Sequence, residues 1–310
     1  MKIVFMGTPE FAVPALEILL DHGYDIPAVI TAPDKPGGRQ GVQVSAVKKF
    51  ALERGLYVMQ PEKLKNPAFL EELRALKADL QIVVAFRMLP EVVWNMPPLG
   101  TMNLHASLLP KYRGAAPINW AIINGETETG LTTFLLRHEI DTGDLLFQER
   151  LPIGENETAG ELHDRMMPLG ARLILKSVQT LEKGEARPQP QADVEATHAP
   201  KIFTDMCRID FSQTTREVHN FIRGLSPYPG AWTELDGKTL KIFRTEIGGA
   251  GLEERGLGVA PEPGAFFSDG KSVLQISTAD GFVRVLELQM EGKRRMSVGE
   301  FLNGYKVRMR

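Results

Sequence analysis

The chain has 310 residues, of which 43% are hydrophobic and 24% are charged, and its formal net charge at pH 7 is −3. This composition is typical of a folded, water-soluble protein and excludes a disordered or fibrous chain. The apolar runs are shorter than the roughly 18 residues of a membrane helix, and the apolar run at the N-terminus is too short for the core of a signal peptide. We therefore expect a cytoplasmic protein with no membrane partner. Cys207 is the single cysteine, which excludes an intramolecular disulfide and a multi-cysteine metal site.

Short apolar runs alternate with amphipathic stretches through the first part of the chain. The expected strands are 2–6, 26–31, 56–59 and 80–86, and the expected helices are 10–20, 44–54, 67–77 and 90–95. A further strand leads into Asn103 and His105, followed by a helix at 117–123, strands at 131–137 and 144–151, and a helix at 158–182. This alternation predicts an α/β fold, a doubly wound, mostly parallel Rossmann-like sheet, over residues 1–187.

The pattern changes after residue 187. Prolines and small polar residues dominate Ala186–Pro200, and we expect a linker at 188–203. The second predicted domain, 204–310, has helices at 214–225 and 298–305 and β-like segments with Asp-Gly pairs at 236–237, 269–270 and 280–281. Each Asp-Gly pair predicts a hairpin, so we expect a small OB-like β-barrel, an architecture that often binds nucleic acid.

Two common phosphate-binding motifs are missing from the sequence. The first strand and helix are joined by Gly7-Thr8-Pro9, which supplies one glycine where the dinucleotide fingerprint has three. No GxxxxGK[ST] loop occurs anywhere in the chain. The sequence therefore disfavours a nicotinamide cofactor and gives no support to ATP or GTP chemistry.

The densest group of chemically useful side chains lies between residues 100 and 117. Asn103 and His105 are two positions apart, so on one strand they project from the same face, and open α/β sheets bind ligands at the carboxyl ends of their strands. A second motif, Ile140-Asp141-Thr142-Gly143-Asp144, places a carboxylate before a tight turn. The residues alone leave two alternatives open: a structural histidine capped by a nearby serine, and an Asp141 that only caps a turn.

An amide, an imidazole and a carboxylate, without a nucleophilic serine or cysteine beside a base, suit the transfer of an acyl group to an amine of the substrate. Asn103 and His105 can donate hydrogen bonds to the oxyanion that develops. Asp141 can orient the imidazole or take the proton of the amine, directly or through water. We therefore expect acyl transfer without a covalent enzyme intermediate and without a metal.

The run NLHASLLPKYRGAAPINWAI at 103–122, followed by IDTGD at 140–144, resembles the folate-dependent formyltransferases. The resemblance implies that Asn103, His105 and Asp141 are catalytic, that Ser107, Leu108, Leu109 and Pro110 lie against the folate, and that 10-formyltetrahydrofolate is the cosubstrate. The start GTPEFAVPAL, the loop PDKPGGR and the two-domain length are similar to family members that formylate methionine on initiator methionyl-tRNA. That implies a catalytic domain at 1–187 and a tRNA-binding domain at 204–310.

Basic residues in three places could contact tRNA. Lys35 and Arg39 lie in a glycine-rich loop, Arg113 follows the expected catalytic strand, and Lys293, Arg294 and Arg295 belong to a C-terminal stretch with a local excess of positive charge. The alternative for each is a solvated surface with incidental charge. We expect a monomer that binds initiator methionyl-tRNA.

Two competing functions stay open from the sequence. One is a folate-dependent formyltransferase that acts on a small amine such as an amino-sugar nucleotide, although a single-domain enzyme of that kind would not need residues 204–310. The other is an RNA-binding module whose Rossmann-like half has lost activity, which the presence of Asn103, His105 and Asp141 disfavours.

Overall fold

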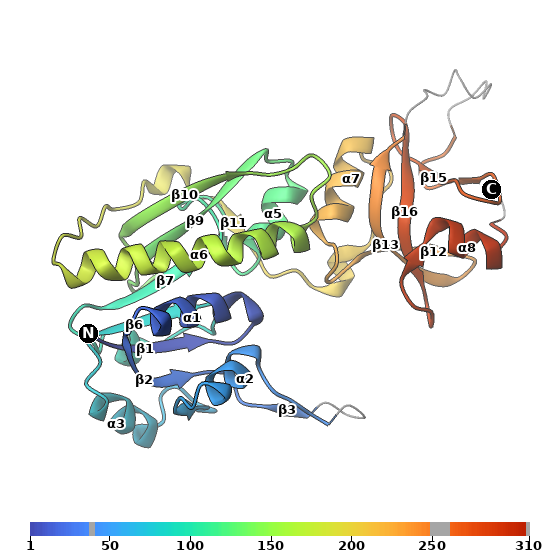
Figure 1. Cartoon of the computed structure of the whole chain (residues 1–310). Coiled ribbons are helices and arrows are strands. Elements are labelled where there is room, and N and C mark those ends of the chain that lie inside the picture. Colours follow the sequence, from blue (N-terminus) through green and yellow to red (C-terminus); the bar gives the residue numbers. More distant parts are fainter. Residues whose placement is uncertain (37–40, 249–260, 308–310) are drawn as a thin grey trace. The chain divides into compact units, whose positions relative to one another are not determined.

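A computed structural model describes residues 1–36, 41–248 and 261–307 (Figure 1). The chain divides into two compact units. Unit 1 comprises residues 1–114, 130–151 and 163–198, and unit 2 comprises residues 115–129, 152–162 and 199–310. The sequence predicted two domains that are each one continuous range, 1–187 and 204–310. Each unit in the structure combines three separate segments, so the predicted domain boundaries stay a prediction.

Unit 1 is built on a seven-stranded sheet with the order β10-β9-β7-β6-β1-β2-β5. Its strands are β1 (Lys2–Gly7), β2 (Asp25–Ile30), β5 (Val58–Met59), β6 (Leu80–Val84), β7 (Thr101–His105), β9 (Glu128–Leu135) and β10 (Leu145–Pro152). The strands from β7 to β5 in this order pair in parallel, and β9 pairs antiparallel with β7. This confirms the predicted doubly wound, mostly parallel α/β fold.

Helices cover this sheet, as Figure 1 shows for α1, α2, α3 and α6. The helices of the first part of the chain are η1 (Glu10–Ala12), α1 (Val13–Asp21), α2 (Ala46–Glu53), α3 (Pro67–Ala75), α4 (Glu91–Trp94), α5 (Pro117–Ile123) and α6 (Ala159–Glu182). Sequence signals explain where two of them begin. The Ser45 side chain accepts a hydrogen bond from Lys48 N at the start of α2, and Asn66 does the same for Ala68 N at the start of α3, with Pro67 in the first turn.

Strands β1 and β6 form the centre of the sheet and are buried on both faces. All five residues of β6 are buried, as are five of the six in β1, which is why both read as continuous apolar runs rather than alternating ones. Gly7 at the end of β1 serves close packing, because a Cβ there would lie 2.7 Å from Ala12 Cβ. This single glycine allows the chain to turn tightly into η1.

Two pairs of very short strands complete this part of the chain. Strand β3 (Lys35–Pro36) pairs with β4 (Val42–Gln43), and β8 (Arg113–Gly114) pairs with β11 (His198–Ala199). A turn of 3-10 helix, η3 (Asp193–Glu195), precedes β11. Strands of two residues are too short to show a periodic pattern of apolar and polar residues, so they were not predicted from the sequence.

Unit 2 contains a six-stranded antiparallel sheet that curls like part of a barrel (Figure 1). Helix α5 belongs to this unit by its residue range, and the elements after residue 199 are η4 (Thr204–Cys207), α7 (Thr215–Gly224), β12 (Ala231–Leu235), β13 (Lys238–Ile247), β14 (Phe266–Ser268), β15 (Leu274–Ser277), β16 (Phe282–Met290), β17 (Met296–Ser297) and α8 (Val298–Gly304). The Asp-Gly pairs lie in the loops between β12 and β13, β14 and β15, and β15 and β16, so all three predicted hairpins are confirmed. At the first of them both Asp236 and Gly237 have positive φ, as a two-residue hairpin turn requires.

A separate apolar core holds unit 2 together. Side chains of α7, β13 and β16, among them Ile222, Ile242 and Val285, are fully buried in it. Helices α7 and α8 each begin with a reciprocal capping box, Thr214 with Glu217 and Ser297 with Glu300. Among the described residues of the chain, no helix combines the length and the hydropathy needed to cross a membrane.

Candidate active site

Strand β7 carries two polar side chains of the candidate site. It lies between β6 and β9 and is hydrogen-bonded to both, and Asn103 and His105 occupy alternate positions near its carboxyl end. His105 is buried and Asn103 is half-buried. Because the strand is fixed on both sides, the two side chains project from a rigid part of the sheet.

The His105 imidazole has a defined hydrogen-bond partner on one side. Its Nε2 lies 2.8 Å from the carbonyl oxygen of Tyr112. A carbonyl can only accept, so Nε2 carries a proton and Nδ1 is the nitrogen without a proton in the neutral ring. That Nδ1 faces Asp141 Oδ2 at 3.8 Å. Nδ1 is therefore the atom of His105 that can take up or release a proton.

Asp141 lies in the loop between β9 and β10 and is almost fully buried. Its Oδ2 accepts a hydrogen bond from the backbone N–H of Gly114, with an N–O distance of 2.9 Å. Asp141 has a positive φ of 56°, which residues other than glycine adopt uncommonly and aspartate more often than most. At Gly143 a Cβ would lie 1.7 Å from the carbonyl oxygen of Leu135, so only glycine fits that position of the loop.

The side-chain amide of Asn103 differs from its neighbours because it makes no hydrogen bond within the described part of the chain. A half-buried amide without a protein partner is uncommon, since desolvation of a polar group is costly unless a hydrogen bond compensates it. The amide is thus available to a ligand beside His105. Donors of this kind can stabilise an oxyanion on a carbonyl substrate.

The segment predicted to contact the folate is held tightly from inside the protein. The Ser107 hydroxyl is fully buried and donates to the carbonyl oxygen of Lys111, with an O–O distance of 2.6 Å. Thr132 Oγ1 donates to Ser107 O and accepts from Leu109 N, and Gln148 donates to Leu109 O. Leu108 packs on Gly130, where a Cβ would lie 2.3 Å from a Leu108 methyl group. The peptide bond between Leu109 and Pro110 is cis. A contact of Ser107, Leu108, Leu109 and Pro110 with folate stays a prediction.

The residues predicted to contact tRNA lie in different environments. Lys35 on β3 is exposed, whereas Arg39 lies outside the described residues. The Arg113 guanidinium is 10% exposed and already donates to Gln191 and Asp193. Lys293, Arg294 and Arg295 are exposed, and the two arginines pair with Glu300 and Glu287. Contacts of these residues with tRNA stay predictions. Arg113 also has a structural role inside unit 1, where it binds Gln191 and Asp193.

Gln191 is a residue of this site that was not predicted from the sequence. This residue lies in the segment expected to be a linker, yet its amide contacts the loop that carries Asp141. The neighbouring Gln189 forms a backbone bridge with Leu145 at the start of β10. No periodicity marks the segment, and its prolines favour a linker, so the sequence offered no signal for this contact.

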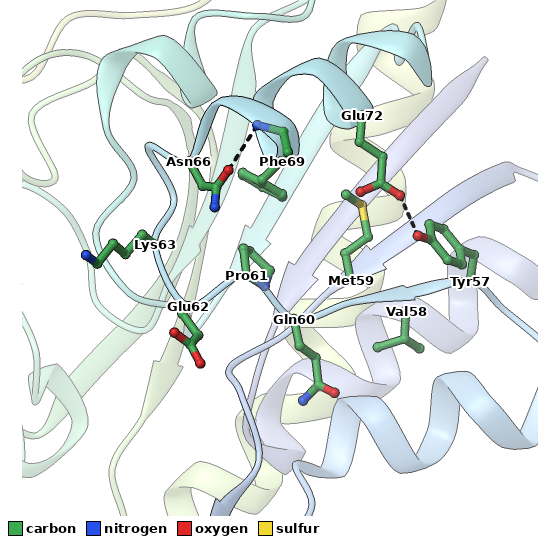
Figure 2. Close-up of a pocket in the computed structure, with 11 residues that line it drawn as sticks. Tyr57, Val58, Met59, Gln60, Pro61, Glu62, Lys63, Asn66, Phe69 and Glu72 are labelled. Carbon is green, nitrogen blue, oxygen red and sulfur yellow. Dashed lines mark hydrogen bonds between the residues drawn. The ribbon is translucent and has the colours of Figure 1, made fainter.

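A separate cavity of about 580 Å³ opens beside the edge strand β5 (Figure 2). It is lined by Tyr57, Val58, Met59, Gln60, Pro61, Glu62, Lys63, Asn66, Ala68, Phe69 and Glu72. The Tyr57 hydroxyl donates a hydrogen bond to the Glu72 carboxylate, with an O–O distance of 2.5 Å. Figure 2 marks this hydrogen bond. Strands β2, β1 and β6 separate β5 from β7 in the sheet, so this cavity is distinct from the His105 site.

Family models match both parts of the chain. The model described as formyl transferase matches residues 1–178, and the model described as formyl transferase, C-terminal domain, matches residues 201–306. A curated protein of Parabacteroides distasonis called methionyl-tRNA formyltransferase is 55% identical, over 99% of this chain and 96% of that protein. Another of that name, from Bacteroides thetaiotaomicron, is 52% identical over 99% of this chain and 96% of its own length.

Solved structures support the fold at much lower identity. The sugar 3N-formyl transferase WlaRD is similar with a TM-score of 0.68 and 21% identity, covering 95% of this chain and 99% of its own. A methionyl-tRNA formyltransferase from Clostridium thermocellum gives a TM-score of 0.57 at 18% identity, covering 79% of this chain and 93% of its own. The family match over most of the chain and the identity to full-length relatives agree with the paired Asn-x-His and Asp-x-Gly motifs, and the chain belongs to the formyl transferase family.

Proposed function

We propose that this protein transfers the formyl group of 10-formyltetrahydrofolate to the α-amino group of methionine on initiator methionyl-tRNA. The observation that carries the proposal is the arrangement of Asn103, His105 and Asp141 at the carboxyl end of β7, in a chain more than half identical to full-length methionyl-tRNA formyltransferases. The reaction needs an oxyanion donor and a proton acceptor but no nucleophile from the enzyme, and that is the set of groups present.

The chemistry follows from where the charge develops. The methionine amine attacks the formyl carbon, a C–N bond forms, and the carbonyl oxygen becomes an oxyanion. The Asn103 amide, which has no hydrogen-bond partner in the described part of the chain, donates a hydrogen bond to that oxygen, with His105 beside it on the same strand. The bond between the formyl carbon and the folate nitrogen then breaks, and the proton lost by the amine replaces the formyl group on that nitrogen.

His105 accepts and releases that proton, and Asp141 stabilises the protonated ring. Because Nε2 of His105 is held by the Tyr112 carbonyl oxygen, proton uptake and release take place at Nδ1. Asp141 Oδ2, at 3.8 Å from Nδ1, stabilises the imidazolium when both ring nitrogens are protonated. The backbone N–H of Gly114 keeps the carboxylate oriented during this step.

The competing substrate class is a small amine. WlaRD and other sugar N-formyltransferases share the fold, but at about one fifth identity that likeness concerns the fold alone. The relatives of more than 50% identity are named for the tRNA reaction and extend through residues 201–306. Exposed Lys35, Lys293, Arg294 and Arg295 supply positive charge for a polyanionic substrate. We further propose that the enzyme acts as a monomer in the cytoplasm, where its tRNA substrate is found.

The test is a formylation assay with 10-formyltetrahydrofolate and three acceptors: methionyl initiator tRNA, methionyl elongator tRNA and free methionine. Formyl-methionine should form on the initiator tRNA, with much lower rates on the other two acceptors. Equal rates on all three would contradict recognition of the RNA. Absence of transfer to all three, with the folate donor still bound, would instead favour the small-amine reaction.

A further inference from the structure

We infer, on the basis of the formyl-transfer function proposed above, that Gln191 is a positioning residue that holds the Asp141 carboxylate in its working place. The Gln191 side-chain nitrogen donates to two carbonyl oxygens of the Asp141 loop, that of Asp141 at 2.7 Å and that of Gly143 at 2.8 Å. One amide group therefore fixes the backbone on both sides of Thr142.

The Asp141 loop needs an external support of this kind. Asp141 has a positive φ, which residues other than glycine adopt less readily, although aspartate tolerates it better than most. The preceding Ile140 is 58% exposed. Gly143 is pressed against the Leu135 carbonyl oxygen, so the loop has little freedom to relax in that direction. Hydrogen bonds to the carbonyl oxygens of Asp141 and Gly143 stabilise this backbone shape without touching the carboxylate itself.

Arg113 determines which way the Gln191 amide points. Gln191 Oε1 accepts two hydrogen bonds from the Arg113 guanidinium, at 3.1 Å from Nε and 2.7 Å from Nη2. The guanidinium only donates and the loop carbonyl oxygens only accept, so a single orientation of the amide satisfies all four contacts. Asp193 completes the chain of contacts by accepting from Arg113 Nη2 at 2.7 Å.

The backbone around Gln191 is anchored on both sides. Gln189 and Leu145 exchange two backbone hydrogen bonds, at 2.7 and 2.9 Å, and these attach the segment to the start of β10. On the other side, Thr197 accepts from the backbone N–H groups of Tyr112 and Arg113. Tyr112 is also the residue whose carbonyl oxygen binds His105 Nε2. The segment 189–197 therefore touches the supports of both His105 and Asp141.

The consequence is kinetic. Asp141 Oδ2 has to stay near His105 Nδ1 and Gly114 N, and a displacement of about 1 Å in a catalytic group can cost up to about 100-fold in rate. Gln191 touches no group proposed to react, so its loss should act through Asp141 alone.

The experiment compares Gln191→Glu with Gln189→Ala in the full chain, with the wild type assayed first on methionyl initiator tRNA. Gln191→Glu keeps the size of the side chain and its acceptors for Arg113 but removes the donors to the loop. We expect kcat to fall by about 10- to 100-fold, with KM for the folate and for tRNA within about threefold. Gln189 has an exposed side chain, so Gln189→Ala should keep the wild-type rate.

Two further measurements separate positioning from general loss of structure. In an Asp141→Asn background, Gln191→Glu should add almost no further loss, because the carboxylate it positions is already gone. Amide hydrogen exchange over residues 139–144 should be faster in Gln191→Glu than in the wild type and unchanged in Gln189→Ala. Gln191→Met removes the donors to the loop without adding a charge, and it also removes the acceptor of Arg113. It should repeat both results and serves if Gln191→Glu does not fold.

Distinct results would overturn each idea. Wild-type kcat and wild-type exchange in Gln191→Glu would refute the positioning role alone, as would losses that multiply in full with Asp141→Asn. A wild-type chain that formylates no methionyl-tRNA would contradict the proposed function, and the exchange measurement would still decide whether Gln191 holds the loop.

Discussion

Two buried polar clusters, one in each unit, use a histidine in opposite ways. In unit 1, His105 faces a carboxylate at 3.8 Å and lies on the same strand as Asn103, whose amide makes no hydrogen bond within the described residues. In unit 2, His219 is 1% exposed and bonds Thr245 Oγ1, and Arg223 donates to Asn220 and to the carbonyl oxygens of residues 154 and 157. One cluster leaves groups available to a substrate. The other holds His219 Nδ1 and the Arg223 guanidinium in hydrogen bonds within the protein, and the buried His219 Nε2 has no partner among the described residues.

The difference shows in the protonation of His219. The pKa of the His219 imidazole is lowered to about 4, mainly by burial and also by the positive charges of Arg223 and Arg216, against an opposing effect of Glu155. The ring is therefore neutral at physiological pH and acts as a structural hydrogen-bonding group. Burial of a histidine alone does not make a catalytic site. A carboxylate 3.8 Å from the imidazole and a half-buried amide with no hydrogen-bond partner among the described residues distinguish the cluster of unit 1.

The largest expected effect separates the two histidines by activity. His105→Ala and Asp141→Asn should each lower kcat by about 10²- to 10⁴-fold, or about 3–5 kcal/mol of transition-state stabilisation, with tRNA affinity nearly intact. His219→Asn, the matched change in unit 2, should leave kcat at neutral pH within about twofold. Steady-state kinetics and tRNA binding measure both. Unchanged turnover in His105→Ala, or a loss of the same size in His219→Asn, would remove the distinction.

The next largest expected effect is on the free energy of unfolding and concerns the buried Arg223 of unit 2. Arg223→Met removes a buried cation together with its hydrogen bonds to Asn220 and to two backbone carbonyl oxygens. Buried acceptors without donors destabilise the folded state, so the free energy of unfolding should fall by about 2–4 kcal/mol. Urea denaturation measures it. A change below about 0.5 kcal/mol would mean that water or relaxation replaces these bonds.

A smaller effect should appear when the pH is lowered. The pKa of His219 is about 4 in the folded protein and near 6.5 when unfolded, so below pH 6.5 the unfolded state binds more protons and is favoured. This contribution is complete above pH 6.5 and is lost as the pH falls toward 4; between pH 7 and pH 5 it amounts to about 2 kcal/mol. His219→Asn should make the pH dependence of unfolding shallower by that amount. Parallel curves for the variant and the wild type would contradict the depressed pKa.

Much of the fold was predictable because it rests on local patterns. The apolar runs 2–6 and 80–86 became β1 and β6, and the three Asp-Gly pairs became hairpin loops. The order of strands was not predictable in the same way, since pairing of β7 with β9 joins residues about 30 positions apart and depends on packing of the whole sheet.

The candidate site was predictable only in part. Asn103 and His105 share a strand face, so alternation placed them together, and their motif pointed to Asp141. Gln191 is different, because its contacts with the Asp141 loop come from a proline-containing segment without periodicity. Arg113 was predicted as a phosphate ligand from its charge and position, but charge in a sequence does not reveal that Gln191 and Asp193 already bind it.

The smallest expected effect extends the comparison of free and engaged groups to the surface of unit 2. Arg294 pairs with Glu300 at 2.7 Å, whereas the Lys293 ammonium has no acceptor among the described residues. Lys293→Ala should reduce the slope of log K against log salt for tRNA by about 0.7–0.9, the value for one phosphate contact. Arg294→Ala should change it less, because that guanidinium must first give up a carboxylate. Titrations of tRNA at several salt concentrations measure both slopes, and equal slopes in the two variants would show that internal pairing does not decide which cations the RNA uses.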